Sequence, residues 1–206
     1  MTTPPTVLVM DLGGVTCRWL PDRRLAALSA LSGLPPATID HQVFESGFDD
    51  AGERGRVALD EFTRTLASML GLETGSPTDR ALRHAWGQAF EPDPEVLRVI
   101  GEARARRALF TNNGPLLEAA MAASDDLAPV REAFDELVFS WHLGITKPEP
   151  EAFARAAERL GAAGGELVLV DDSEANVAAA AHAGWHAHRF TTVADLRTAL
   201  ADLGLL

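Results

Sequence analysis

Three acidic side chains directly follow short apolar runs, where a strand can hold a carboxylate rigidly. Asp11 follows VLVM, and Asp171 and Asp172 follow LVLV. A carboxylate nucleophile splits the slow hydrolysis of a phosphate ester into two displacements. Mg²⁺ suits such a site, because it prefers oxygen ligands and is typically held by one or two carboxylates, water and substrate phosphate. These residues predict metal-assisted attack on phosphorus, with Asp11 as the nucleophile.

A second set of polar residues offers positive charge and hydrogen-bond donors. Thr111, Asn112 and Asn113 follow the apolar run ALF, and Lys147 lies in GITKPEP. Lysine presents a compact charge to a phosphate or to a carboxylate beside it. The Thr111 hydroxyl and the Asn112 backbone N–H can donate to phosphoryl oxygens, and Gly13 offers a backbone carbonyl to the metal. We expect catalysis by Asp11, Lys147 and Thr111, phosphate binding by Asn112, Asn113 and Gly13, and metal ligation by Asp11, Gly13, Asp171 and Asp172.

Short apolar runs alternate with helical patterns in the second half of the chain. Wholly apolar strands alternating with helices indicate a parallel sheet covered on both faces. Ligands bind beyond the carboxyl ends of such strands, so the polar residues above should meet at one edge. The expected strands are 7–10, 108–110, 136–140, 167–170 and 186–190, and the expected helices are 94–107, a region from 116, 150–161, 174–184 and 193–204.

Residues 16–90 lack this alternation. Their segments show helical periodicity, and we predict no strand between them. A run of helices inserted after the first strand indicates a small helical subdomain. The predicted organisation is an α/β core over 1–15 and 91–206 with a helical cap over 16–90.

Five segments, in order along the chain, resemble the motifs of the haloacid dehalogenase (HAD) superfamily in its helical-cap branch. They are DLGGV, ERGRVALDEF, FTNNG, KPEPEAF and DDSEANVAAAAHAGW. The resemblance implies a Rossmann-like sheet flanked by helices, Mg²⁺ as cofactor, and an aspartyl-phosphate on Asp11. The glycine two residues after Asp11 resembles a sugar-phosphate phosphatase group that includes glucose-1-phosphatases. The expected activity is hydrolysis of a small phosphorylated metabolite.

Gly13 departs from the usual pattern of these phosphatases. Most of them have a second aspartate at this position, which protonates the leaving group and activates water, and such a residue is worth about 10²–10⁴ in rate. Either the cap or the substrate supplies the acid instead, or the enzyme is slow. Two alternatives stay open: a metal-independent haloacid dehalogenase, and a non-catalytic homologue that binds a phosphorylated ligand or a partner. Trp19, Arg18 and Glu53 are candidates for the cap's pocket, and Asn176 for orienting a site carboxylate or the lysine.

The composition limits the partners. The formal net charge of −12 opposes binding to nucleic acid or anionic lipid. The single cysteine, Cys17, excludes an internal disulfide and a cysteine-cluster metal site. The sequence shows no signal-peptide pattern and no apolar segment long enough to span a membrane, so a cytoplasmic protein is expected. Oligomeric state is left open.

Overall fold

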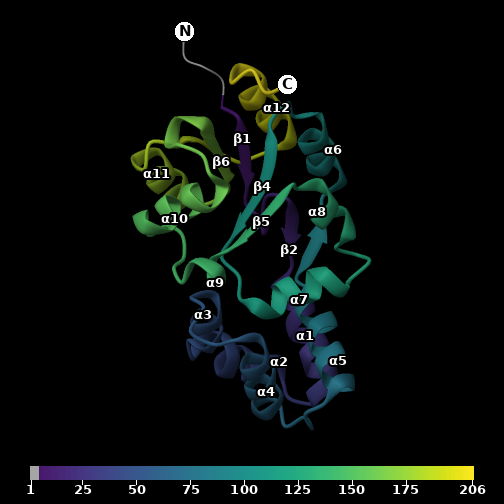
Figure 1. Cartoon of the computed structure of the whole chain (residues 1–206). Helices are drawn as coiled ribbons and strands as arrows, with labels where there is room; N and C mark the ends of the chain where they lie inside the picture. The colour runs from purple at the N-terminus through teal and green to yellow at the C-terminus, as the bar shows by residue number, and fades with distance from the viewer. Residues whose placement is uncertain (1–4) are drawn as a thin grey trace.

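A five-stranded parallel sheet forms the centre of the molecule in a computed structural model that describes residues 5–206 (Figure 1). Residues 1–4 of the predicted core lie outside the described residues. The strand order is β5-β4-β1-β6-β7, and every neighbouring pair is parallel. The strands are β1 (Val7–Met10), β4 (Arg106–Thr111), β5 (Glu136–Phe139), β6 (Leu167–Asp171) and β7 (His186–Arg189). The predicted α/β class is confirmed.

Helices cover both faces of this sheet because its central strands are apolar on both sides. Along β1, Leu8 and Met10 join one hydrophobic cluster, while Val7 and Val9 join another. The first cluster contains residues of α6 (Pro94–Glu102), α7 (Pro115–Ala123), α8 (Ala128–Ala133) and α12 (Val193–Asp202). The second contains residues of α9 (Ser140–Leu143), α10 (Pro150–Leu160) and α11 (Glu174–His182). A 3₁₀ turn, η2 (Gly164–Glu166), directly precedes β6.

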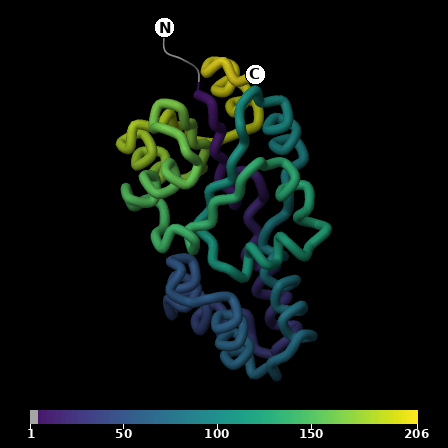
Figure 2. Tube along the Cα trace, viewed as in Figure 1, coloured from purple at the N-terminus to yellow at the C-terminus, as the bar shows by residue number. Residues whose placement is uncertain are grey.

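Between β1 and α6 the chain forms a helical insertion that lies beyond the carboxyl edge of the sheet (Figures 1 and 2). Phe62 and Trp86 are buried inside it and pack edge to face. Its helices are α1 (Pro21–Ser32), α2 (Pro36–Ile39), the π-helix η1 (Asp40–Glu45), α3 (Phe48–Glu53), α4 (Leu59–Met69) and α5 (Ser76–Gly87). The proposed boundaries of core and cap stay a prediction.

Two short strands connect the insertion to the sheet. β2 (Cys17–Trp19) and β3 (Phe90–Pro92) pair antiparallel, with Trp19 opposite Phe90. The prediction of no strand over 16–90 was therefore wrong, because a strand of three residues is too short to show a period of two.

A second correction concerns the expected helix over 94–107. The helix ends at Glu102, and Arg106 and Arg107 already belong to β4. These arginines lie at the more exposed start of the strand, so their polarity hid its beginning. In residues 5–206, no helix is both long and apolar enough to cross a membrane.

Candidate active site

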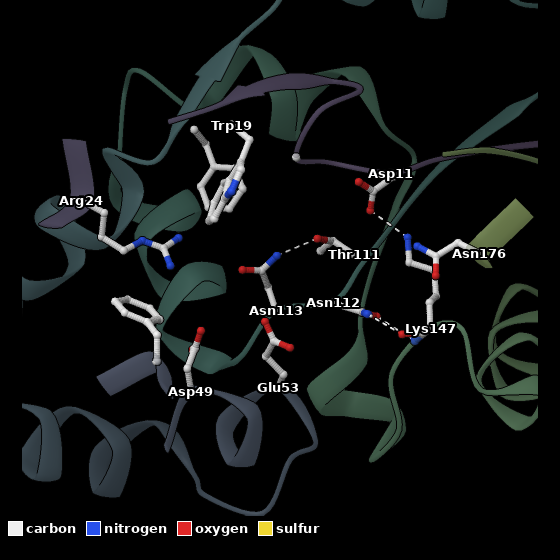
Figure 3. A pocket seen from close by; sticks show the side chains of 13 residues that line it. Asp11, Trp19, Arg24, Asp49, Glu53, Thr111, Asn112, Asn113, Lys147 and Asn176 are labelled. Atoms are coloured by element: carbon white, nitrogen blue, oxygen red, sulfur yellow. Dashed lines mark hydrogen bonds and ion pairs between the residues drawn. The ribbon is translucent and has the colours of Figure 1, made fainter. Parts of the chain in front are cut away.

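The predicted site residues meet at one edge of the sheet. Asp11 follows β1, Thr111 ends β4 and Asp171 ends β6, and these three strands are neighbours. A cavity of about 270 Å³ opens between this edge and the helical insertion (Figure 3). Its walls include Asp11, Gly13, Thr111, Asn112, Asn113, Lys147 and Asn176 from the sheet side. The expectation that sequence-distant polar groups would converge is confirmed.

Lys147 lies at the centre of the cluster. Its Nζ donates hydrogen bonds to Asp11 Oδ1 at 2.7 Å, to Asp171 Oδ2 at 2.6 Å and to the carbonyl of Phe110 at 2.8 Å. The side chain is 1% exposed. Burial opposes its charge, but the carboxylates of Asp11 and Asp171 outweigh burial and raise the pKa of Lys147. Lys147 is therefore a fixed positive charge in contact with two acids.

Asp11 is held in place by its main chain. Its N–H donates to the carbonyl of Val170 at 2.9 Å, and the Thr16 hydroxyl donates to its carbonyl at 2.6 Å. Burial raises the pKa of Asp11 to about 6, and Asp171 adds to the rise while Lys147 opposes it. A carboxylate in this position gains from any further cation placed beside it.

Asp11, Asp171 and Asp172 form a group that fits a divalent cation. Each offers a carboxylate oxygen, and these oxygens all lie within 4.8 Å of one another. Asp171 is 1% exposed and also accepts hydrogen bonds from Lys147, from the Ser173 N–H and from the Asn176 side chain. Asp172 is exposed. An all-oxygen donor set with one solvent-facing member is the kind of site that Mg²⁺ takes. A contact through the carbonyl of Gly13 stays a prediction.

Two asparagines fix the neighbouring loops, and a third orients an acid. Asn112 Nδ2 donates to the carbonyl of Lys147 at 2.8 Å, and its Oδ1 accepts from the Lys147 N–H at 2.9 Å. Asn113 Nδ2 donates to the Thr111 hydroxyl at 2.7 Å. Asn176 Nδ2 donates to both carboxylate oxygens of Asp171, at 2.9 and 3.1 Å, so it orients a carboxylate. The side chain of Asn112 thus positions the lysine, and its backbone N–H is the group predicted to face phosphate.

A substitution at Gly14 tests whether Asp172 belongs to the proposed metal site. Its φ is +83°, and a Cβ there would lie 2.4 Å from Asp172 Oδ2. We expect Gly14→Ala to displace Asp172 and to raise the Mg²⁺ concentration for half-maximal activity by about 10–100-fold, the usual cost of disturbing a ligand's support. Titration calorimetry with Mg²⁺ would report the same loss.

Gly33→Ala is the matched control. Gly33 has φ +74°, and a Cβ added to it would meet nothing within 4 Å. The control therefore carries the backbone strain of about 1–2 kcal/mol without the clash. Equal Mg²⁺ dependence in the two variants would contradict a metal role for Asp172.

The insertion supplies the opposite wall of the cavity. Arg24 is 3% exposed, and its guanidinium lies 4.5 to 5.7 Å from the ring centroids of Trp19, Phe44, Trp86 and Phe90. The carboxyl groups of Asp49 and Glu53 of α3 point into the cavity (Figure 3). Trp19 and Glu53 line the cavity as the sequence suggested. Arg18 does not, because it pairs with Glu91 at the surface.

Sequence reasoning missed Arg24, Phe44, Asp49 and Phe90. They come from different elements of the insertion, and only the packing of those elements brings them to one cavity. Arg24 follows two other charged residues at the start of a helix, and no sequence motif distinguishes it from them. Cys17, interpreted as a small buried residue, is 1% exposed, and burial raises the pKa of its thiol to about 12.

The fold and site together define a hydrolase with a Rossmann-like α/β fold, whose candidate catalytic groups lie at the carboxyl ends of parallel strands. A family model for haloacid dehalogenase-like hydrolases matches residues 25–184. The chain belongs to this family of enzymes, as its motifs indicated.

Several known proteins are similar to the chain over most of its length. D-ribitol-5-phosphate phosphatase of Bacteroides thetaiotaomicron is 26% identical over 199 residues, which cover 94% of this chain and 95% of that protein. A HAD family enzyme of the same organism, solved in complex with magnesium and inorganic phosphate, is 21% identical with a TM-score of 0.71, covering 91% of this chain and 94% of that one.

A third similar protein catalyses a different reaction. L-2-haloacid dehalogenase of Xanthobacter autotrophicus, with chloropropionic acid covalently bound, has 20% identity and a TM-score of 0.58, covering 98% of this chain and 84% of that one. These two structural matches support the fold alone. The choice between reactions depends on the residues of the site.

Proposed function

We propose that this chain is a Mg²⁺-dependent phosphatase that hydrolyses a small phosphorylated metabolite through an aspartyl-phosphate on Asp11. The observation that carries the proposal is the group of three carboxylates, Asp11, Asp171 and Asp172, of which Asp11 and Asp171 pair with the buried ammonium of Lys147. Two carboxylates beside the nucleophile repel an anionic organic halide, whereas a divalent cation bound by them attracts a phosphate. The site therefore favours phosphatase over metal-independent dehalogenase.

The proposed first step is attack of the Asp11 carboxylate on phosphorus. Asp11, Asp171 and Asp172 would hold Mg²⁺, together with the carbonyl of Gly13. When bound, Mg²⁺ supplies charge neutralisation of the phosphoryl oxygens. Lys147 holds Asp11 in position and keeps positive charge beside the transferring group. Thr111, Asn112 and Asn113 line the cavity on this side and supply hydrogen-bond donors to phosphoryl oxygens.

The proposed substrate class is sugar or polyol phosphates. The relative named D-ribitol-5-phosphate phosphatase supports this class, as does the size of the cavity, about 270 Å³. Arg24, Asp49 and Glu53 provide polar groups where the alcohol part of the ester would lie. Such groups suit a leaving group that carries hydroxyls, because buried polar groups bind ligands that satisfy them.

Removal of the metal is the first test. We expect a panel of phosphorylated metabolites that includes D-ribitol 5-phosphate, and p-nitrophenyl phosphate, to release phosphate with Mg²⁺. EDTA should reduce the rate at least about 100-fold, since a catalytic metal contributes several kcal/mol, and excess Mg²⁺ should restore it. Chloride release from 2-chloropropionate, measured in parallel, is expected to be absent. Halide release that persists in EDTA, without phosphate release, would establish the dehalogenase instead.

A further inference from the structure

We propose that Glu53 of α3 is the acid and base of the reaction, which protonates the leaving oxygen and then activates the hydrolytic water. The inference rests on the proposed function and assigns the role that Gly13 cannot fill. Glu53 lines the cavity from the insertion, opposite the edge that carries Asp11 (Figure 3). An ester bound with its phosphate at Asp11 extends toward this wall.

Contacts with the sheet side fix the main chain of Glu53. The Ser140 hydroxyl donates to the Glu53 carbonyl at 2.7 Å, and the Ser140 hydroxyl oxygen accepts from the Asn113 N–H at 3.1 Å. Gly114 packs against this turn so closely that an added Cβ would lie 3.1 Å from the carbonyl carbon of Gly52. The end of α3 is therefore attached to the loop that carries Asn113, and the Glu53 side chain starts from a defined place.

The carboxyl group of Glu53 has no protein partner within residues 5–206, in which no hydrogen bond or ion pair to it is found. The neighbouring Arg54 forms salt bridges with Asp50 at 2.9 Å and with Glu149 at 2.5 Å, and none with Glu53. The Glu53 side chain is half-buried and reaches the cavity. A half-buried carboxyl group that faces a cavity without a partner is available to a ligand.

The charges around Glu53 favour its protonated form. Burial raises its pKa most, and Asp49 and Asp50 of the same helix raise it further. Arg24 of α1 and Arg54 lower it, and the resulting pKa is about 8. Across the cavity, the charge of Asp11 is paired with that of Lys147. A proton is thus present on Glu53 near neutral pH, as an acid for the leaving group requires.

The surroundings of Gly13 are apolar. A Cβ on Gly13 would lie 3.5 Å from a ring carbon of Phe90 and 3.6 Å from one of Trp19. These two rings pack together with centroids 4.9 Å apart. Position 13 thus faces two apolar rings and carries no carboxyl group of its own, whereas α3 presents one to the same cavity.

In the proposed reaction, an Asp11 oxygen forms a bond to phosphorus while the bond from phosphorus to the leaving oxygen breaks. The Glu53 proton moves to that oxygen to give the alcohol. The resulting Glu53 carboxylate takes a proton from water, whose oxygen attacks phosphorus. The bond between phosphorus and Asp11 breaks, and inorganic phosphate, the Asp11 carboxylate and protonated Glu53 are formed.

Glu53→Gln tests this role through its dependence on the leaving group. With D-ribitol 5-phosphate, or another alkyl ester that the wild type hydrolyses, we expect kcat to fall by about 10²–10⁴. With p-nitrophenyl phosphate the leaving group needs no proton, so a rapid burst of about one nitrophenolate per site should precede slow turnover. The wild-type kcat for the alkyl ester should decrease above pH 8, and the variant should lack this decrease.

Asp49→Asn is the matched control, because it removes a carboxylate from the same helix and the same cavity. We expect it to give no burst with p-nitrophenyl phosphate, because Glu53 is still present to activate water. With the alkyl ester we expect KM to change more than kcat, since Asp49 lies where the alcohol part would bind. Equal loss with both esters and no burst in Glu53→Gln would overturn the role of Glu53. A wild type that hydrolyses neither ester would instead overturn the proposed phosphatase function, so the two failures are distinguishable.

Discussion

Asp11→Asn is expected to abolish phosphate-ester hydrolysis, with a loss of at least about 10⁴-fold. An amide cannot attack phosphorus, and losses of this size are typical when a covalent nucleophile is removed. The substitution keeps the shape of the side chain and leaves an oxygen that can accept from Lys147, whose second acid, Asp171, stays in place. Phosphate release at saturating Mg²⁺ is the measurement.

A labelling experiment accompanies this test. Acid-quenched wild-type protein should carry phosphate at Asp11, and the variant should carry none. Circular dichroism should show cooperative unfolding for both proteins. Activity of Asp11→Asn within about tenfold of wild type would exclude the covalent mechanism, because the amide supplies no nucleophile.

Lys147→Ala is the second substitution with a large expected effect. It leaves the carboxylates of Asp11 and Asp171 next to each other without their cation. Breaking a buried ion pair by removing one partner costs about 3–5 kcal/mol in the free energy of unfolding. We also expect kcat to fall by about 10²–10³, comparable to the loss of one charge-stabilising donor. Urea denaturation and phosphate release are the two measurements.

Mg²⁺ and a surface arginine provide the controls for Lys147→Ala. If Asp11 and Asp171 share a metal, Mg²⁺ should stabilise the variant more than it stabilises the wild type. Arg189→Ala removes a cation whose side chain is 55% exposed, and it should change stability by no more than about 0.5 kcal/mol. Wild-type stability in Lys147→Ala would show that the buried charges do not interact as described.

The parallel sheet was predictable because its strands are short and wholly apolar. The segments VLVM and LVLV form β1 and β6 in the structure, as predicted. The acidic residues at the ends of these two strands lie in one group. The pattern failed where an element is very short, as in β2, or where arginines begin a strand, as in β4. In β2 there are too few residues to show an alternation of apolar and polar side chains, and in β4 the polar first residues conceal where the strand begins.

The lysine of the site has a sequence signal of its own. Of the 18 lysine and arginine residues, Lys147 is the only lysine. All the other basic residues counted are arginines. At position 147 a compact ammonium donates to three converging oxygens, an arrangement that a planar guanidinium would not match. The insertion's contribution had no such signal. Arg24 and Asp49 reach the cavity only through the packing of α1 and α3, which short motifs do not describe.

The close contact between Gly114 and the Gly52–Glu53 peptide has a consequence for which esters can enter. Two segments of main chain touch there, so no rotamer change can widen the separation between the insertion and the sheet edge. A bulkier alcohol would require α3 to withdraw as a unit and to give up its hydrogen bond from Ser140. At this point the distance between the insertion and the sheet edge is thus set by main-chain packing, whereas the side chains that line the cavity set the shape and chemistry of the space that remains.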